Sequence, residues 1–160
     1  MRPIHRGDAK RWRAGLQVAH RWHDTDVLEL SISASNNTFT GGAFPYLAIG
    51  QLAELAATLD GFPTNSSDIR ELEFGANGEG SAGGYVHLRF SCRDHAAHAI
   101  IETQIESKNE HRPETPWSRA SQSAHFFAAI EPSAVDGFVK ELRQLNEQKT
   151  GTAWLPFVST

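Results

Sequence analysis

Two neighbouring segments of this chain alternate apolar and polar residues with a period of two, and this pattern constrains the fold most. In residues 84–93, Val86, Leu88 and Phe90 occupy alternate positions with polar side chains between them, and residues 98–107 repeat the alternation. Successive side chains of a strand point to opposite faces, so both segments are predicted to be strands with one buried face. The short connection at residues 93–97 predicts an antiparallel hairpin.

The rest of the chain adds further strands and two helices. Strand patterns occupy residues 27–35, 38–44, 69–75 and 120–130, and an additional strand is possible around residues 16–22. Helical spacing of apolar residues occurs within residues 47–59, which Gly61 and Pro63 end, and again from Val135 to Leu145, where Ser133 and Asp136 have the spacing of a capping pair. The predicted fold class is α+β, an antiparallel sheet of about six strands with two amphipathic helices packed on one face.

Charge divides the chain unevenly. Residues 1–22 hold six basic side chains against Asp8, a net charge of +5, and the remainder holds nine basic and 18 acidic side chains, a net charge of −9. We therefore predict a basic N-terminal arm over residues 1–26, one α+β domain over 27–146 and a C-terminal tail over 147–160. The arm, with its tryptophans, could contact RNA, but an acidic body argues against nucleic acid as the main partner.

Composition excludes several classes of protein. Cys92 is the only cysteine, so an internal disulfide and any multi-cysteine metal site are excluded. There is no apolar run long enough to cross a bilayer and no secretory signal pattern, so we expect a cytoplasmic protein without membrane contact.

Three motifs resemble chemical signatures. Residues 78–83 match G-x-G-x-x-G, but the alternating segment that follows predicts a Gly-rich hairpin loop, not a dinucleotide turn. The pairs His20/His23 and His95/His98 have H-x-x-H spacing. On a helix this spacing would let two imidazoles share a metal, and the first pair, beside Asp24 and Asp26, is the better but weak candidate.

The polar face of the predicted sheet is the most informative candidate site. It would present the following side chains: Glu29, Glu71, Glu73, His87, Arg89, Glu102, Gln104, Glu106 and His125. Such a face can simply be solvated, or its acidic side chains can receive a basic protein surface. In a third interpretation, His87, Glu102 and His125 perform acid–base chemistry.

A set of short motifs between residues 27 and 145 resembles a group of small bacterial proteins that includes immunity proteins of the WapI-like type. The motifs are Phe39-x-Gly41, Leu59-x-Gly61-Phe62-Pro63, Phe90-Ser91-Cys92-Arg93-Asp94 leading to a His98-containing hairpin, and Phe138-x-x-x-Leu142. This sequence departs from the pattern at Ala97, where relatives often have glycine.

The resemblance implies a cofactor-free α+β protein that acts by binding another protein, and it transfers no catalytic residues. Together with the acidic face, it predicts an interaction module that binds a toxin-like partner through Glu71, Glu73, His87, Arg89 and Glu102. The alternative is a small hydrolase or ligand-binding enzyme using His87, Glu102 and His125, with or without a metal.

Overall fold

The computed structural model describes residues 13–77, 83–96, 98–108 and 121–158. Nine strands and two helices follow one another in these ranges: β1 (Gly15–His23), β2 (Val27–Ser35), β3 (Thr40–Ala43), β4 (Tyr46–Ala48), α1 (Gln51–Leu59), β5 (Arg70–Phe74), β6 (Tyr85–Cys92), β7 (Ala99–Lys108), β8 (Ser121–Ile130), α2 (Pro132–Gln148) and β9 (Thr152–Pro156).

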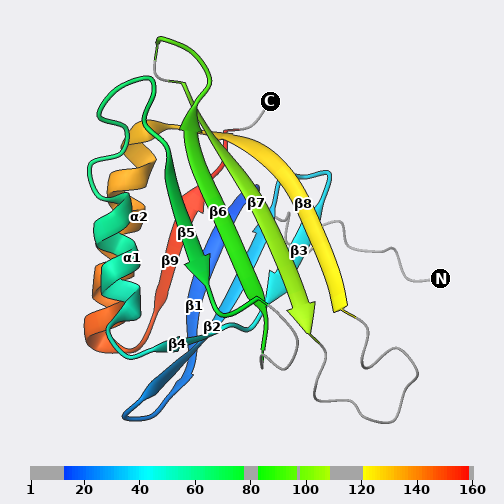
Figure 1. Ribbon diagram of the computed structural model, residues 1–160, viewed down its shortest axis with the longest axis vertical. Coiled ribbons are helices and arrows are strands. Elements are labelled where there is room, and N and C mark those ends of the chain that lie inside the picture. Colours follow the sequence, from blue (N-terminus) through cyan, green and yellow to red (C-terminus); the bar gives the residue numbers. More distant parts are fainter. Residues whose placement is uncertain (1–12, 78–82, 97, 109–120, 159–160) are drawn as a thin grey trace, which may run out of the picture.

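The strands form two antiparallel sheets that face each other (Figure 1). One sheet has the order β3-β2-β1-β9, with β4 also pairing with β2, and the other has the order β5-β6-β7-β8. Helix α2 packs on β9, and α1 packs on α2 and β5, so the helices close one side of the molecule. On the other side, β3 meets β7 and β8.

The predicted single sheet of about six strands is therefore wrong in its strand count and in its number of sheets, although the α+β class is confirmed. The possible strand near residues 16–22 is present as β1 and lies at the centre of its sheet. Strands β4 and β9 were not predicted, since β4 has only three residues and β9 lies in the segment expected to be a C-terminal tail.

The core lies between the two sheets and under the helices. The alternate apolar positions of β2 and β6 turn inward, and Leu30, Leu88 and Phe90 are fully buried. Gly41 allows the two sheets to approach, because a Cβ atom added there would lie 2.9 Å from the Cβ of Ala124 on β8.

Both helices occur where the apolar periodicity predicts them. Gly61 has a φ of +78° directly after the last turn of α1, which is the left-handed conformation expected of a C-terminal cap. The predicted capping pair Ser133/Asp136 is wrong. The N-cap of α2 is Glu131, two residues before Ser133, with Pro132 in the first turn, and Glu131 makes no side-chain capping bond.

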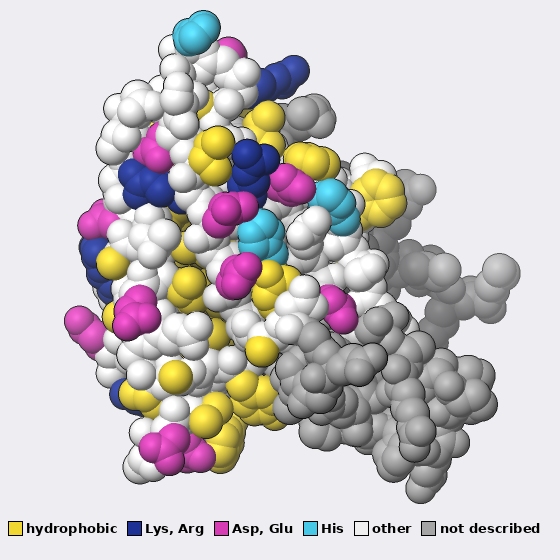
Figure 2. Space-filling view, in the orientation of Figure 1, with side chains coloured by type: hydrophobic (Ala, Val, Ile, Leu, Met, Phe, Trp, Pro, Cys, Tyr) yellow, Lys and Arg dark blue, Asp and Glu magenta, His cyan; other side chains and the backbone are white. Residues whose placement is uncertain are grey.

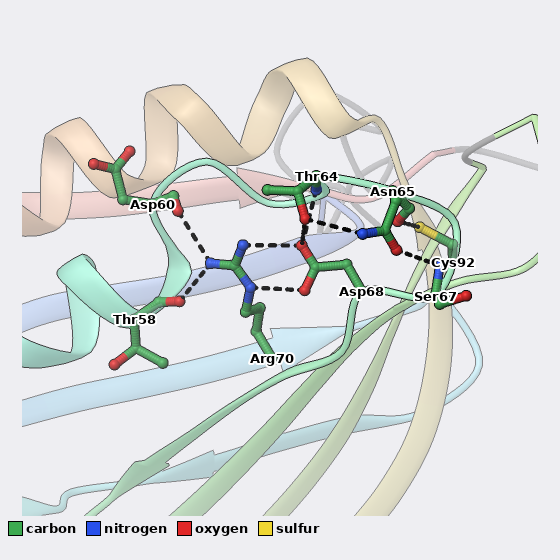
Figure 3. A network of polar contacts seen from close by, with 8 residues as sticks. All are labelled: Thr58, Asp60, Thr64, Asn65, Ser67, Asp68, Arg70 and Cys92. Carbon is green, nitrogen blue, oxygen red and sulfur yellow. Dashed lines mark hydrogen bonds and ion pairs between the residues drawn. The ribbon is translucent and has the colours of Figure 1, made fainter.

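A partly buried ion pair fixes the connection between α1 and β5 (Figure 3). The Arg70 guanidinium donates to both carboxylate oxygens of Asp68, at 2.8 and 2.9 Å, and to the backbone carbonyls of Thr58 and Asp60. Thr64 donates its N–H and its hydroxyl to the same carboxylate. We call this group the Arg70 latch; every contact within it holds backbone segments together, which is a structural role.

Replacing Asp68 by Asn should destabilise the protein, and the loss should depend on pH. The side-chain hydrogen bonds from Arg70 lower the pKa of Asp68 from 3.8 to about 2. A carboxylate with a depressed folded-state pKa stabilises the fold above pH 4, and that stabilisation disappears as the pH falls from about 4 to 2. Urea unfolding at pH 7 should therefore show a loss of about 1–2 kcal/mol in Asp68→Asn.

Asp60→Asn is the matched control, because the Asp60 carboxylate makes an exposed pair with Arg143 at 3.0 Å. Exposed pairs contribute little, so the control should lose less than about 0.5 kcal/mol. Equal losses in the two variants would contradict the assignment of the latch.

One polar group is buried inside the core. Thr103 lies on the inner face of β7 between Leu88 and Phe126, is fully buried, and its hydroxyl has no hydrogen-bond partner among the described residues. Thr103→Val should therefore raise the free energy of unfolding by about 1 kcal/mol, measured by urea denaturation. The reverse change at the neighbouring strand, Val86→Thr, should lower it by about 1–3 kcal/mol. A loss of stability in Thr103→Val would show that the hydroxyl is satisfied.

Candidate functional site: the outer face of the β5–β8 sheet

Strand register places the predicted polar side chains of β5–β8 in rows across one surface. One row joins Glu71, Arg89, Glu102 and Phe127; the next joins Glu73, His87, Gln104 and His125; a third joins Tyr85, Glu106 and Ser123. We call these residues the outer face. Figure 2 shows acidic, imidazole and arginine side chains gathered over the middle of this sheet.

Glu29 does not belong to this face. The sequence interpretation grouped it with the other polar residues, but Glu29 lies on β2 in the opposite sheet, where its carboxylate pairs with Arg21 at 2.9 Å. The error follows from assuming one sheet, because alternation shows that a residue points outward but not which sheet carries it.

Glu102 is the centre of the outer face. Its Oε1 lies 2.9 Å from Nε2 of His125 on β8, and its Oε2 lies 4.0 Å from Nη1 of Arg89 on β6. The side chains of Arg89 and His125 are 43% and 49% exposed, while that of Glu102 is 22% exposed. Glu102 therefore joins three strands through one partly buried carboxylate.

His87 is directed elsewhere. Its Nε2 lies 3.4 Å from Oε1 of Glu71, and its Nδ1 is buried with no partner among the described residues. His87 and His125 lie in the same row, on either side of Gln104, so about two strand spacings of roughly 5 Å separate their backbones. Of the three residues suggested for acid–base chemistry, the structure brings only Glu102 and His125 into contact.

Tyr85 is a neutral hydrogen-bond donor among the carboxylates of this face. Burial, and then a hydrogen bond from its hydroxyl to Glu73, raise the pKa of Tyr85 to about 12. The nearby carboxylates Glu71 and Glu106 act in the same direction. The phenol therefore stays protonated at neutral pH and donates to Glu73.

Large apolar side chains border the charged rows. Phe127 is 56% exposed at the end of the Glu102 row, next to the imidazole of His125 with a ring-centroid distance of 5.3 Å. Asn36 holds this corner, because its amide donates to the Phe127 carbonyl at 3.0 Å and its oxygen accepts from the Phe39 N–H at 2.8 Å. Phe39 is 58% exposed, so this corner presents two exposed aromatic residues whose backbones are joined through one amide.

Sequence reasoning missed Phe127, Phe39 and Tyr85 as members or neighbours of this site. Phe127 and Tyr85 were detectable, because each shares the outward phase of its strand with a histidine, His125 or His87. Phe39 was not, because only the contact from Asn36 brings its loop to β8.

His20 and His23 do meet, but on a strand. A bulge at Arg21 turns both imidazoles to one side, and Nε2 of His20 lies 2.8 Å from Nδ1 of His23. The nearby Asp24 carboxylate accepts from the backbone of the turn, at Asp26 and Val27, and does not complete a ligand set. Within the described ranges, no group of three or more His, Cys, Asp or Glu side chains is placed to hold a metal ion.

The second histidine pair diverges, as expected for a turn. Nδ1 of His95 lies 3.5 Å from the Ser66 hydroxyl, whereas Nδ1 of His98 lies 2.7 Å from the Asp94 carboxylate, whose hydrogen bond raises the pKa of His98. Cys92 packs partly buried against the core, and burial raises the pKa of its thiol.

The glycine-rich segment joins two antiparallel strands, β5 and β6, so no helix follows it and the expected hairpin connection is confirmed. Residues 78–82 themselves lie outside the described residues, as do residues 1–12 of the basic arm and the polar segment 109–120.

No model of a known protein family, no curated protein and no solved structure matches this chain. None of the helices in the described part of the chain is long and apolar enough to span a membrane. The functional conclusion therefore depends on the geometry of the outer face.

The ionisation of Tyr85 tests the electrostatics of this face. In a Tyr46→Phe background Tyr85 is the only tyrosine, so ultraviolet absorbance reports its ionisation alone. With a pKa of about 12, Tyr85 should be roughly one-tenth ionised at pH 11. Glu73→Gln removes the acceptor charge and should increase the ionised fraction several-fold. Glu54→Gln on α1 should leave it unchanged. Nearly complete ionisation at pH 11 before the Glu73 change would contradict the described environment.

Proposed function

We propose that this protein is an interaction module of the immunity-protein type, whose outer face binds and occludes a basic surface on a toxin-like partner protein. The observation that carries the proposal is the charge of that face. Its three rows hold four carboxylates, those of Glu71, Glu73, Glu102 and Glu106, and among the described side chains of these rows Arg89 is the one lysine or arginine. With neutral histidines the net charge of the described face is −3, which attracts a basic surface and accelerates encounter.

The contacts within the face leave carboxylates available to a partner. Glu102 is 22% exposed and already engaged by His125 at 2.9 Å, whereas the Glu71 side chain is 56% exposed and its described ion-pair contact, to His87, is longer at 3.4 Å. Glu71 and Glu73 are therefore the best positioned to pair with lysines or arginines of a partner. Arg89 and Glu102 fix the centre of the face.

The aromatic corner supplies an anchor beside these charges. Interfaces gain most of their affinity from a few large side chains that become desolvated, with charged contacts around them. Phe127 is exposed, yet Asn36 fixes its backbone, so little conformational freedom would be lost on binding.

The exposure of the polar groups favours recognition over catalysis. Arg89 and His125 are each about half exposed, and charges in contact with water stabilise a transition state weakly. The same exposure suits a face whose charges become desolvated only when a partner covers it.

Charge reversal tests the proposal. A tagged protein should capture a stoichiometric partner from lysate of the source organism, identified by mass spectrometry, and Glu71→Lys/Glu73→Lys should lower the affinity of that partner at least tenfold. The reason is that two attractive contacts become repulsive.

Glu54→Lys/Glu147→Lys is the matched control, because it makes the same change of charge on exposed positions of α1 and α2. Equal weakening by both double variants would show a general charge effect and contradict a binding site on the outer face. Capture that neither variant weakens would place the interaction elsewhere.

A second candidate is a small hydrolase or ligand-binding enzyme, and the 2.9 Å contact between His125 and Glu102 favours it. A carboxylate can orient an imidazole that acts as a general base. His125→Ala separates the candidates, because it should abolish turnover of a substrate while leaving the pairing of Glu71 and Glu73 with a basic partner.

A further inference from the structure

The described chain begins beside the outer face. The carbonyl of Ala14, just before β1, accepts from the N–H of Phe157, and the next residue, Val158, donates to the carbonyl of Ala129 on β8. Ala129 is two residues from Phe127 and shares its outward phase. The first described residues of the chain therefore lie close to the aromatic corner of the outer face.

The arm has the charge that this face lacks. Residues 1–12 carry Arg2, Arg6, Lys10 and Arg11 against Asp8, a net charge of +3, and the described face carries −3. Opposite charges of equal size within a tether attract each other without the entropy cost of bringing two molecules together.

The spacing of these charges fits the width of the sheet. Four residues of extended chain, the spacing from Arg6 to Lys10, span about 13 Å, and the two gaps between β7 and β5 span about 10 Å. An arm that leaves the β8 edge can therefore place Lys10 or Arg11 near Glu102 on β7. The same arm brings Arg6 to Glu71 and Glu73 on β5.

We infer that the basic arm, residues 1–12, docks across the outer face of its own chain and occupies the carboxylates until a more basic or larger partner displaces it. The inference goes beyond the proposed function, because it concerns the isolated chain and requires no partner. It also assigns the arm a protein surface as its ligand.

A zero-length carbodiimide cross-link tests the docking in the full-length protein. The reagent joins an amine only to a carboxylate in contact with it, and Lys10 is the only lysine of the arm. After tryptic digestion, we expect Lys10 linked to the fragments 71–89 and 94–108, at least tenfold above its links to Glu54 and Glu147 on the helices. The yield should fall several-fold in 0.5 M NaCl, which screens the attraction.

Two variants make the result specific. Lys10→Arg keeps the charge and should abolish the link, and Arg6→Lys adds a second amine that should link to Glu71 or Glu73. Absence of face links in both the natural chain and Arg6→Lys would overturn the inference. Links spread evenly over helix and face carboxylates would overturn it as well.

Mixed isotopic labelling shows whether the arm docks on its own chain or on a second copy. If light and heavy chains are mixed, docking within one chain gives only light–light and heavy–heavy links, as we expect. A majority of light–heavy links would overturn the inference in favour of a second copy as the occupant. A partner captured through Glu71 and Glu73 without any Lys10 link would remove this inference and leave the proposed function standing.

Discussion

The burial of two apolar sheet faces against each other is the constraint on which the rest of this structure depends. Side chains of a strand alternate with period two, so once Leu88 and Phe90 are buried, His87 and Arg89 between them must point away from the core. The same argument applies to Glu71 and Glu73 on β5. Burial of one side of these strands therefore leaves their other side facing outward as the outer face. Only the residue types on that face can be adapted to binding.

This alternation of buried and outward positions explains why the sequence predicted some features well. Strand phases, both helices and the glycine after α1 depend on local spacing, and local spacing is visible along the chain. The division into two sheets depends on which strands pair across long separations. The pairing of β1 with β9 joins residues near the two ends, and nothing in residues 152–156 identifies β1 as their partner.

The candidate site shows the same limit at the level of side chains. Alternation correctly placed Glu102 and His125 on the outside, but only register shows that they touch, with 2.9 Å between the two side chains, and that His87 turns to Glu71 instead. Glu29 has the same phase on its own strand and belongs to the other sheet. Alternation tells which way a side chain of one strand points, whereas a site forms from side chains of several paired strands.

A tethered basic arm would change what the outer face can select. Tethering gives a segment an effective local concentration on the order of millimolar, so even a weak intrinsic affinity keeps the face largely occupied. A ligand that offers only a few positive charges then gains little, since it must displace equivalent contacts. A partner that also covers Phe127 adds apolar burial, and its total affinity can exceed that of the arm. Specificity would then come from the aromatic corner, whereas the charges would set the threshold that any partner must exceed.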